Sequence, residues 1–240
     1  MKRISKPIAD DELLYLLNRD DPYIIECGAH DGRDTERFLK LFPRCRIIAF
    51  EPDPRPINRL HPPGFLARVG NDPRTRLIEV AVGDKEGTAI LYRSSGTPPK
   101  QVVDDWDHSS SLRRPTGHLE WSPWCTFPQE KEIEVQVITL DKLFEDLADW
   151  SGGLHTHKII NGRPFDLIWI DVQGGQEALI KGGASTIKQS RYVFIECHKT
   201  PMYDGEPTQI ELVHYFDQLG FDPIALYEGY NFLFESVREC

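Results

Sequence analysis

The chain has 240 residues, of which 40% are hydrophobic and 28% are charged, and this composition excludes a largely disordered protein. The length fits a single α/β domain over residues 1–240, with room for a long functional loop. The formal net charge of −10 repels phosphate backbones, so we expect no nonspecific binding of nucleic acid.

The first half of the chain alternates short apolar runs with amphipathic segments. The run Tyr23–Cys27 ends at a glycine, as a buried strand does. A helix opens at Asp34 and is closed by Pro43. We therefore predict an initial helix at residues 10–19, that second helix, and strands at residues 23–27, 45–50, 77–82 and 88–93.

The segment Ser94–Gln129 has no periodicity, and we expect a loop insertion at about residues 94–130. A loop of this length is uncommon in a compact domain unless it works as a lid or a binding element. The segment is rich in Pro, Ser and Gly, yet it carries Trp106, Trp121 and Trp124. Two interpretations stay open: the aromatic rings close over an acceptor, or they pack the loop onto the domain as a satellite core.

The second half repeats the strand and helix alternation of the first. We predict strands at residues 132–140, 165–170, 192–195, 223–227 and 230–234, helices at residues 141–150, around 177–180 and at 208–219, and a loop at 152–163. The last two strands are joined at Glu228-Gly229, which suits a hairpin turn. This order favours a mostly parallel sheet with helices on both faces and a C-terminal β-hairpin whose last strand is antiparallel.

Three features of the sequence favour a cytoplasmic protein. No stretch approaches the ~18 consecutive apolar residues of a membrane span, so we expect no membrane partner. No apolar stretch follows the basic residues near Met1, so no signal peptide is visible. The five cysteines show no paired spacing, which is typical of small core side chains in a reducing compartment.

The first predicted strand leads into a glycine turn with acidic neighbours, Glu26–Gly32. Its glycine spacing is G-x-x-x-G, not the G-x-G-x-x-G with which dinucleotide enzymes hold a pyrophosphate. Glu26 and Asp31 flank these glycines and would repel a diphosphate, but they suit a ligand that carries ammonium and sulfonium groups. The alternative is that the segment is only a tight turn between a strand and a helix.

The second predicted strand ends in Phe50-Glu51-Pro52. An ionised carboxylate only accepts hydrogen bonds, so Glu51 is placed to accept hydrogen bonds from both hydroxyls of a ribose. An exposed acidic residue at a strand end is the plainer alternative. The preceding glycine turn favours the ribose interpretation.

Four segments together resemble the FkbM family of methyltransferases. They are Ile25–Gly32, Phe50–Pro52, Ala81–Asp84 and Ile170–Gly174, and they occur in the family's order between about residues 23 and 234. The resemblance implies a Rossmann-like class I methyltransferase fold with a seven-stranded sheet, and S-adenosylmethionine as cofactor. It also implies methylation of a hydroxyl oxygen on a sugar, glycan or other small natural-product-like acceptor.

Carried over by position, the resemblance assigns residues to each part of the cofactor. It implies that Glu26, Gly28 and Gly32 face the amino-acid part, that Asp31 belongs to the same loop, and that Glu51 holds the ribose. It further implies that Ala81 and Val82 lie by the adenine, and that Ser110, within the element Ser109–Leu112, lies near the methionine moiety.

Two glutamines depart from the family pattern. Family members commonly carry glutamates where this chain has Gln173 and Gln176. The change removes carboxylates from the expected reaction cleft, which weakens any inference of acid–base chemistry or metal binding. It keeps open a non-catalytic S-adenosylmethionine-binding protein as an alternative. An NAD-dependent dehydrogenase is the second alternative, and the missing G-x-G-x-x-G opposes it.

Three further polar residues stand at or just after predicted strand ends: Asp171, Glu196 and His198. Strand ends of a parallel sheet meet at one edge, so we expect the three to converge on the cleft. One of them would take the proton from the acceptor hydroxyl, with Asp171 first because it also matches the family motif. Alternatively, the three would hold a divalent cation such as Mg²⁺. These residues leave the acceptor and the oligomeric state open.

Overall fold

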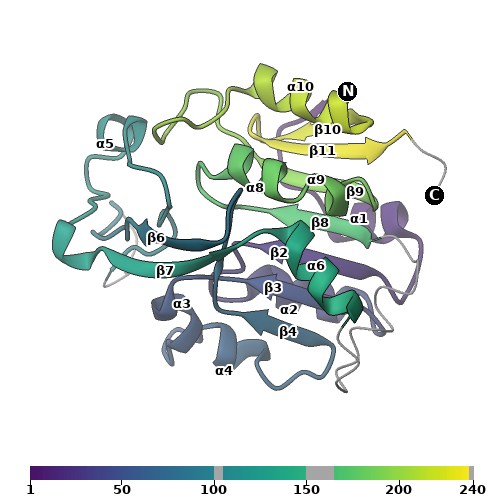
Figure 1. The fold of residues 1–240 in the computed structure, drawn as a ribbon, viewed down its shortest axis with the longest axis horizontal. Helices are drawn as coiled ribbons and strands as arrows, with labels where there is room; N and C mark the ends of the chain where they lie inside the picture. The colour runs from purple at the N-terminus through teal and green to yellow at the C-terminus, as the bar shows by residue number, and fades with distance from the viewer. Residues whose placement is uncertain (100–104, 150–164, 238–240) are drawn as a thin grey trace.

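The central strands of the sheet are apolar on both faces. Every residue of β2 (Tyr23–Cys27) and of β8 (Phe165–Ile170) is buried, which is the pattern of parallel strands that are covered on both sides. The computed structural model describes residues 1–99, 105–149 and 165–237. In this part of the chain the main sheet has eight strands, in the order β1-β10-β11-β9-β8-β2-β3-β4 (Figure 1).

The other strands of this sheet are β1 (Lys2–Ile4), β3 (Arg46–Phe50), β4 (Thr75–Ile78), β9 (Ser190–Glu196), β10 (Phe221–Tyr227) and β11 (Asn231–Ser236). All pair in parallel except β11, which runs antiparallel to both of its neighbours. The expected mostly parallel sheet with its C-terminal hairpin is therefore confirmed, but among the described residues it has eight strands rather than the expected seven. The short strand β1, which pairs with β10, was not predicted.

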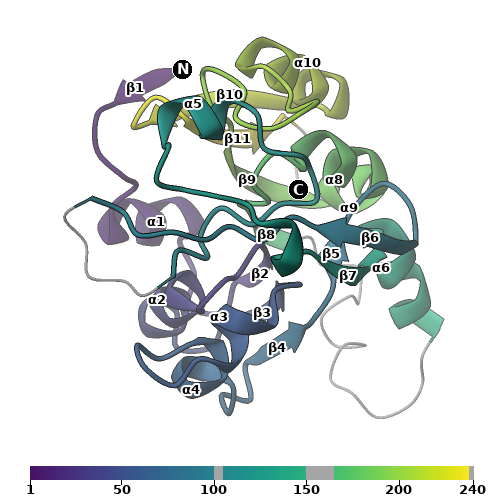
Figure 2. The same cartoon turned by 90° about the vertical axis from the view of Figure 1, so that its left-hand side faces the viewer.

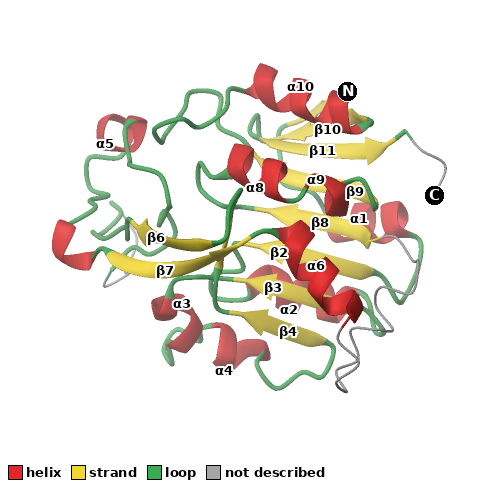
Figure 3. Ribbon diagram, viewed as in Figure 1, coloured by secondary structure: helices red, strands yellow, loops and turns green. Residues whose placement is uncertain are grey.

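Helices cover both faces of the sheet, as expected (Figure 3). The face that includes Ile25 and Ile168 packs against α6 (Leu140–Asp149), α8 (Gln176–Gly182), α9 (Ala184–Ile187) and α10 (Gln209–Leu219). The face that includes Ile24 and Leu167 packs against α1 (Asp10–Leu17), α2 (Arg33–Leu41) and α4 (Phe65–Val69). A short helix, α3 (Pro54–Asn58), precedes α4. None of the described helices is long and apolar enough to cross a bilayer.

A small second sheet lies beyond the carboxyl ends of the parallel strands (Figure 2). It consists of β5 (Ala81–Val82), β7 (Ile133–Ile138) and β6 (Gly87–Leu91), in that order. The prediction of one continuous strand at residues 77–82 is wrong, because β4 ends at Ile78 and β5 belongs to the second sheet. The amide of Val80 turns back to the Ile78 carbonyl at 2.9 Å, which ends the pairing with β3.

The predicted loop insertion contains two short helical turns, α5 (Gly117–Trp121) and η1 (Gln129–Lys131), in its described part. Isolated bridges attach it to the domain, pairing Ser111 with Tyr92 and Pro115 with Tyr203. Trp106 meets Trp124 edge to face at 5.2 Å, whereas Trp121 is 66% exposed. Part of the loop is therefore packed. The predicted loop at residues 152–163 lies outside the described residues.

Candidate active site

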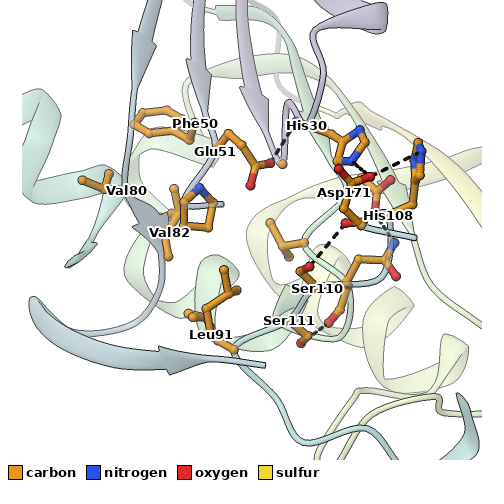
Figure 4. A pocket seen from close by; sticks show the side chains of 18 residues that line it. His30, Phe50, Glu51, Val80, Val82, Leu91, His108, Ser110, Ser111 and Asp171 are labelled. Carbon is orange, nitrogen blue, oxygen red and sulfur yellow. Dashed lines mark hydrogen bonds and ion pairs between the residues drawn. The ribbon is translucent and has the colours of Figure 1, made fainter. Parts of the chain in front are cut away.

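A cavity of about 730 Å³, its open mouth included, lies where the chain order of the strands diverges, between β2 and β8. This position is the one where α/β sheets bind ligands. Figure 4 shows an apolar end formed by Phe50, Val80, Val82 and Leu91. The opposite end is polar, with His30, His108, Ser110 and Asp171. Glu51 lies between the two ends.

Two glycines shape the turn between β2 and α2. Gly28 has a φ of +87°, and a Cβ at this position would lie 1.8 Å from the carbonyl oxygen of Asp171. Gly32 caps α2 with a φ of +77°, and a Cβ there would lie 2.9 Å from the Phe65 ring. Positive φ and close contact both require glycine. The turn therefore brings the end of β2 directly against the end of β8.

Both oxygens of the Glu51 carboxylate accept backbone hydrogen bonds. Oε2 accepts from the amide of His30 and Oε1 from the amide of Asp53, each at 2.8 Å. Burial raises the pKa of Glu51 to about 7, although the charge of His30 and these two amides favour the ionised form. Each oxygen retains a lone pair, so the carboxylate stays an acceptor for a ligand hydroxyl.

The other residues that we expected to contact the cofactor divide into two groups. Gly28, Ala81, Val82 and Ser110 line the cavity together with Glu51. Glu26, Asp31 and Gly32 do not line it.

The two acidic residues that do not line the cavity have protein partners. Glu26 accepts a hydrogen bond from the Thr35 hydroxyl at 2.5 Å, and burial with repulsion from Asp34 raises its pKa well above the usual value. Asp31 pairs with Arg33 at 3.1 Å. Burial would raise the pKa of Asp31, but interaction with His30 and the nearby arginines lowers it to about 2. Both carboxyls are thus positioned to stabilise the turn.

A cluster that the sequence analysis missed lines the polar end of the cavity. His30 Nε2 lies 2.8 Å from Asp107 Oδ1, and the His108 ring lies 4.0 Å from the His30 ring between centroids. Asp107 also pairs with Arg59 at 2.6 Å. Ligand atoms of the two histidines and Asp107 come within 4.8 Å of one another, so the three are a possible metal-binding set. Asp107 and His108 belong to the aperiodic loop, where no sequence pattern predicts a contact with His30.

The two histidines of this cluster differ in charge. Burial would lower the pKa of His30, but hydrogen bonds to Asp107 and Asp31 raise it to about 9. Burial and the neighbouring His30 charge lower the pKa of His108 to about 4. At neutral pH the cluster therefore pairs an imidazolium with Asp107, beside a neutral imidazole.

The three predicted catalytic residues do not share one cavity wall. Asp171 lines the cavity, whereas Glu196 and His198 do not. His198 Nδ1 is instead 2.9 Å from Glu206 Oε1. Glu196 is the last residue of β9 and His198 follows that strand, and β9 is separated from β2 by β8.

Gln173 connects two of these carboxylates. Its amide nitrogen donates to Asp171 Oδ1 at 2.6 Å and to Glu196 Oε2 at 2.7 Å. Burial and repulsion from Asp171 raise the pKa of Glu196 well above its usual value. Gln176, the other departure from the family pattern, is buried and donates to the Glu196 carbonyl at 3.0 Å. Both glutamines thus donate hydrogen bonds to protein groups at the carboxyl ends of β8 and β9.

The chain is similar to several known proteins. The sequence profile described as "Methyltransferase FkbM domain" matches residues 26–223. The 2-O-methyltransferase NoeI of Sinorhizobium fredii (strain NBRC 101917 / NGR234) is 33% identical over 195 residues, which cover 81% of this chain and 71% of that protein. A crystal structure of Methyltransferase FkbM from Methylobacillus flagellatus KT aligns with a TM-score of 0.49 and 13% identity, over 90% of this chain. The chain spans 44% of that structure's length. The profile match and the 33% identical relative show that this chain belongs to the FkbM methyltransferase family.

Proposed function

We propose that the protein transfers a methyl group from S-adenosylmethionine to a hydroxyl of a sugar or another small natural-product-like acceptor. The position of Glu51 carries this proposal, because its carboxylate stands between an apolar and a polar end of one cavity. An adenosyl group has that order of parts: a flat base, then a ribose with two hydroxyls, then a charged chain. The relative named as a 2-O-methyltransferase supports oxygen as the accepting atom.

The residues of the cavity fit this cofactor in shape and charge. Ala81, Val82 and Leu91 offer an apolar surface for the adenine, and Glu51 accepts from the ribose. Asp171 places a carboxyl group at the polar end, where a sulfonium would be stabilised and a pyrophosphate repelled, whereas Asp107 is already paired with His30 and Arg59. When bound, S-adenosylmethionine supplies a methyl group that is already activated by its sulfonium.

The remaining chemistry is positioning and proton transfer. The acceptor oxygen loses its proton as it takes the methyl group, and Asp171 is our first candidate to receive that proton because it alone of the three expected bases lines the cavity. Glu196 and His198 follow it as weaker candidates. Holding the acceptor in line with the methyl group supplies most of the acceleration.

The same features bear on the alternatives. A non-catalytic S-adenosylmethionine-binding protein is the second candidate, because Gln173 and Gln176 stand where relatives commonly carry acids and both make structural hydrogen bonds. The G-x-x-x-G spacing of the glycine turn opposes an NAD-dependent dehydrogenase. For the cellular site we propose the cytoplasm, which agrees with four buried cysteines that are all unpaired.

The test is methyl transfer itself. Purified protein is incubated with methyl-deuterated S-adenosylmethionine and a panel of neutral oligosaccharides and glycosides, and mass spectrometry follows the label. We expect labelled methyl ethers, and none with the Asp171→Asn variant at equal protein concentration. Saturable binding of the cofactor without transfer to any hydroxyl compound would favour the non-catalytic alternative.

A further inference from the structure

A second cleft opens beside the first, on the face of the sheet that α1 and α2 cover. Its volume is about 670 Å³, open mouth included. Its wall joins the carboxyl ends of β8 and β9 with the start of β11, the first half of α2 and the segment before α1. The polar side chains that reach it include three carboxyls, an amide and a phenol: Asp34, Asp171, Glu196, Asn231 and Tyr230.

Asp171 lines both clefts. The first cleft extends from Asp171 toward Val82 and Leu91, whereas the second extends toward Trp169 and Tyr230. A group transfer needs donor and acceptor to meet within about 3–3.5 Å, so two binding sites for one reaction must adjoin at one point. The shared side chain marks that point.

The wall of the second cleft is negative, and its basic side chain is engaged. Arg37 directs Nε to Asp10 Oδ1 and Nη2 to the Ile8 carbonyl, each at 2.7 Å. Its Nη1 lies 4.0 Å from Asp34, at the limit of an ion pair. The guanidinium is therefore held by protein groups, and the three carboxyls outnumber this one positive charge on the wall of the cleft.

The carboxyls of the second cleft suit hydroxyl groups, which donate and accept at once. Burial raises the pKa of Asp34, with repulsion from Asp171 and Asp31, although the charge of Arg37 acts in the opposite direction. The pKa of Glu196 is raised in the same direction by burial and by Asp171. A carboxyl that keeps its proton donates a hydrogen bond, and an ionised one accepts it. The half-buried ring of Tyr230 adds an aromatic surface on which an apolar sugar face can pack.

We propose that this second cleft binds the methyl acceptor, and that its carboxyls select a neutral, polyhydroxylated sugar ring over an anionic one. The inference rests on the proposed function, since a second substrate is needed only if the first cleft binds the methyl donor. It adds a location and a charge preference to that function. A hydroxyl of the sugar would then point from the second cleft toward Asp171.

Saturation-transfer NMR in the presence of S-adenosylhomocysteine tests this assignment. The probes are methyl β-glucoside and methyl β-glucuronoside, which share a ring and differ by one carboxylate. We expect the neutral glycoside to bind more tightly than the uronide. Asp34→Asn and Tyr230→Ala should each lower the affinity for the neutral glycoside about tenfold. This is the effect of losing one hydrogen bond to a charged group or one ring contact. In Asp34→Asn the preference over the uronide should also decrease.

Asp222→Asn is the matched control, because Asp222 is exposed on β10 and lines neither cleft. This variant should bind the neutral glycoside like the wild type. Calorimetry with S-adenosylhomocysteine is run on every variant, and thermal unfolding confirms that each is folded. An unchanged glycoside affinity in both cleft variants, or no neutral glycoside binding in the wild type, would overturn the assignment.

The donor affinity separates the two proposals. If S-adenosylhomocysteine binds the wild type but both cleft variants bind the glycoside with unchanged affinity, the assignment of the acceptor site is wrong and the proposed function stands. If Asp34→Asn weakens S-adenosylhomocysteine as much as the glycoside, the second cleft belongs to the donor site, which also overturns the assignment. If S-adenosylhomocysteine fails to bind the wild type, the proposed function itself fails.

Discussion

Gly28 lies directly against Asp171: a Cβ on Gly28 would come within 1.8 Å of the Asp171 carbonyl oxygen. The contact is reinforced by the hydrogen bond from the Asp171 amide to the Cys27 carbonyl at 2.9 Å. The ends of β2 and β8 are therefore locked together at the point where the cavity forms. The geometry of the site depends on a residue that has no side chain.

The first prediction concerns this contact. Gly28→Ala should lower the melting temperature and the affinity for S-adenosylhomocysteine, because the added methyl group must displace the backbone at the end of β8. Gly229→Ala is the matched control, since Gly229 has nearly the same φ, +84°, but a methyl group added there would have nothing within 4 Å. Both variants bear the strain of a positive φ, about 1 kcal/mol. Equal melting temperatures and affinities in the two variants would show that the contact is unimportant.

The second prediction concerns the charge of Glu51. With its pKa near 7, Glu51 gains charge as pH rises through that value, so affinity for S-adenosylhomocysteine should rise over the same range. Glu51→Gln should flatten this dependence and bind more weakly at high pH, because its amide also opposes one of the two backbone donors. Calorimetry between pH 6 and about 8 measures both. A wild-type affinity that does not change with pH would contradict the assignment.

The third prediction concerns His30 and stability. The pKa of His30 is raised to about 9 in the folded protein, so its stabilising effect is full below the unfolded value of 6.5 and is lost as pH rises through 9. His30→Gln should therefore lose less stability than the wild type over that interval. Denaturant unfolding at several pH values measures the difference. His214→Gln, at an exposed position on α10, should behave like the wild type. Parallel pH curves for wild type and His30→Gln would refute the pairing with Asp107.

The fourth prediction concerns the proton acceptor. Asp171→Asn should slow methyl transfer by ~10²–10⁴-fold while S-adenosylhomocysteine affinity stays near normal. Glu196→Gln and His198→Gln should have smaller effects, because neither side chain lines the first cavity. A metal-dependent mechanism predicts differently: chelation would abolish the rate and added Mg²⁺ or Mn²⁺ would restore it. Near-normal rates in all three variants, without a chelator effect, would mean that the site works by positioning alone.

Much of the sheet could be predicted from the sequence, because its central strands are continuous apolar runs. The strand β1 could not, since Lys2 and Arg3 are exposed and its place depends on pairing with β10 far along the chain. The break after Ile78 was also hidden, because apolar residues continue across it into the second sheet.

The site was predictable where a residue directly follows a strand, as Gly28, Glu51 and Asp171 do. Glu26 failed to line the cavity because it lies within β2, where it points with Ile24 toward α2 rather than beyond the strand end. The pair of His30 and Asp107 joins residues 77 positions apart through an aperiodic loop. Only the folded structure brings such residues together.

The most direct test of the account is a calorimetric titration of the protein with S-adenosylhomocysteine and, in parallel, with NAD. The account predicts saturable binding of S-adenosylhomocysteine, none of NAD, and a loss of about 1.5–3 kcal/mol in Glu51→Ala, the range for a hydrogen bond to a charged group. Binding of NAD in preference to S-adenosylhomocysteine, or an unchanged affinity in Glu51→Ala, would contradict the assignment of this cavity to the methyl donor.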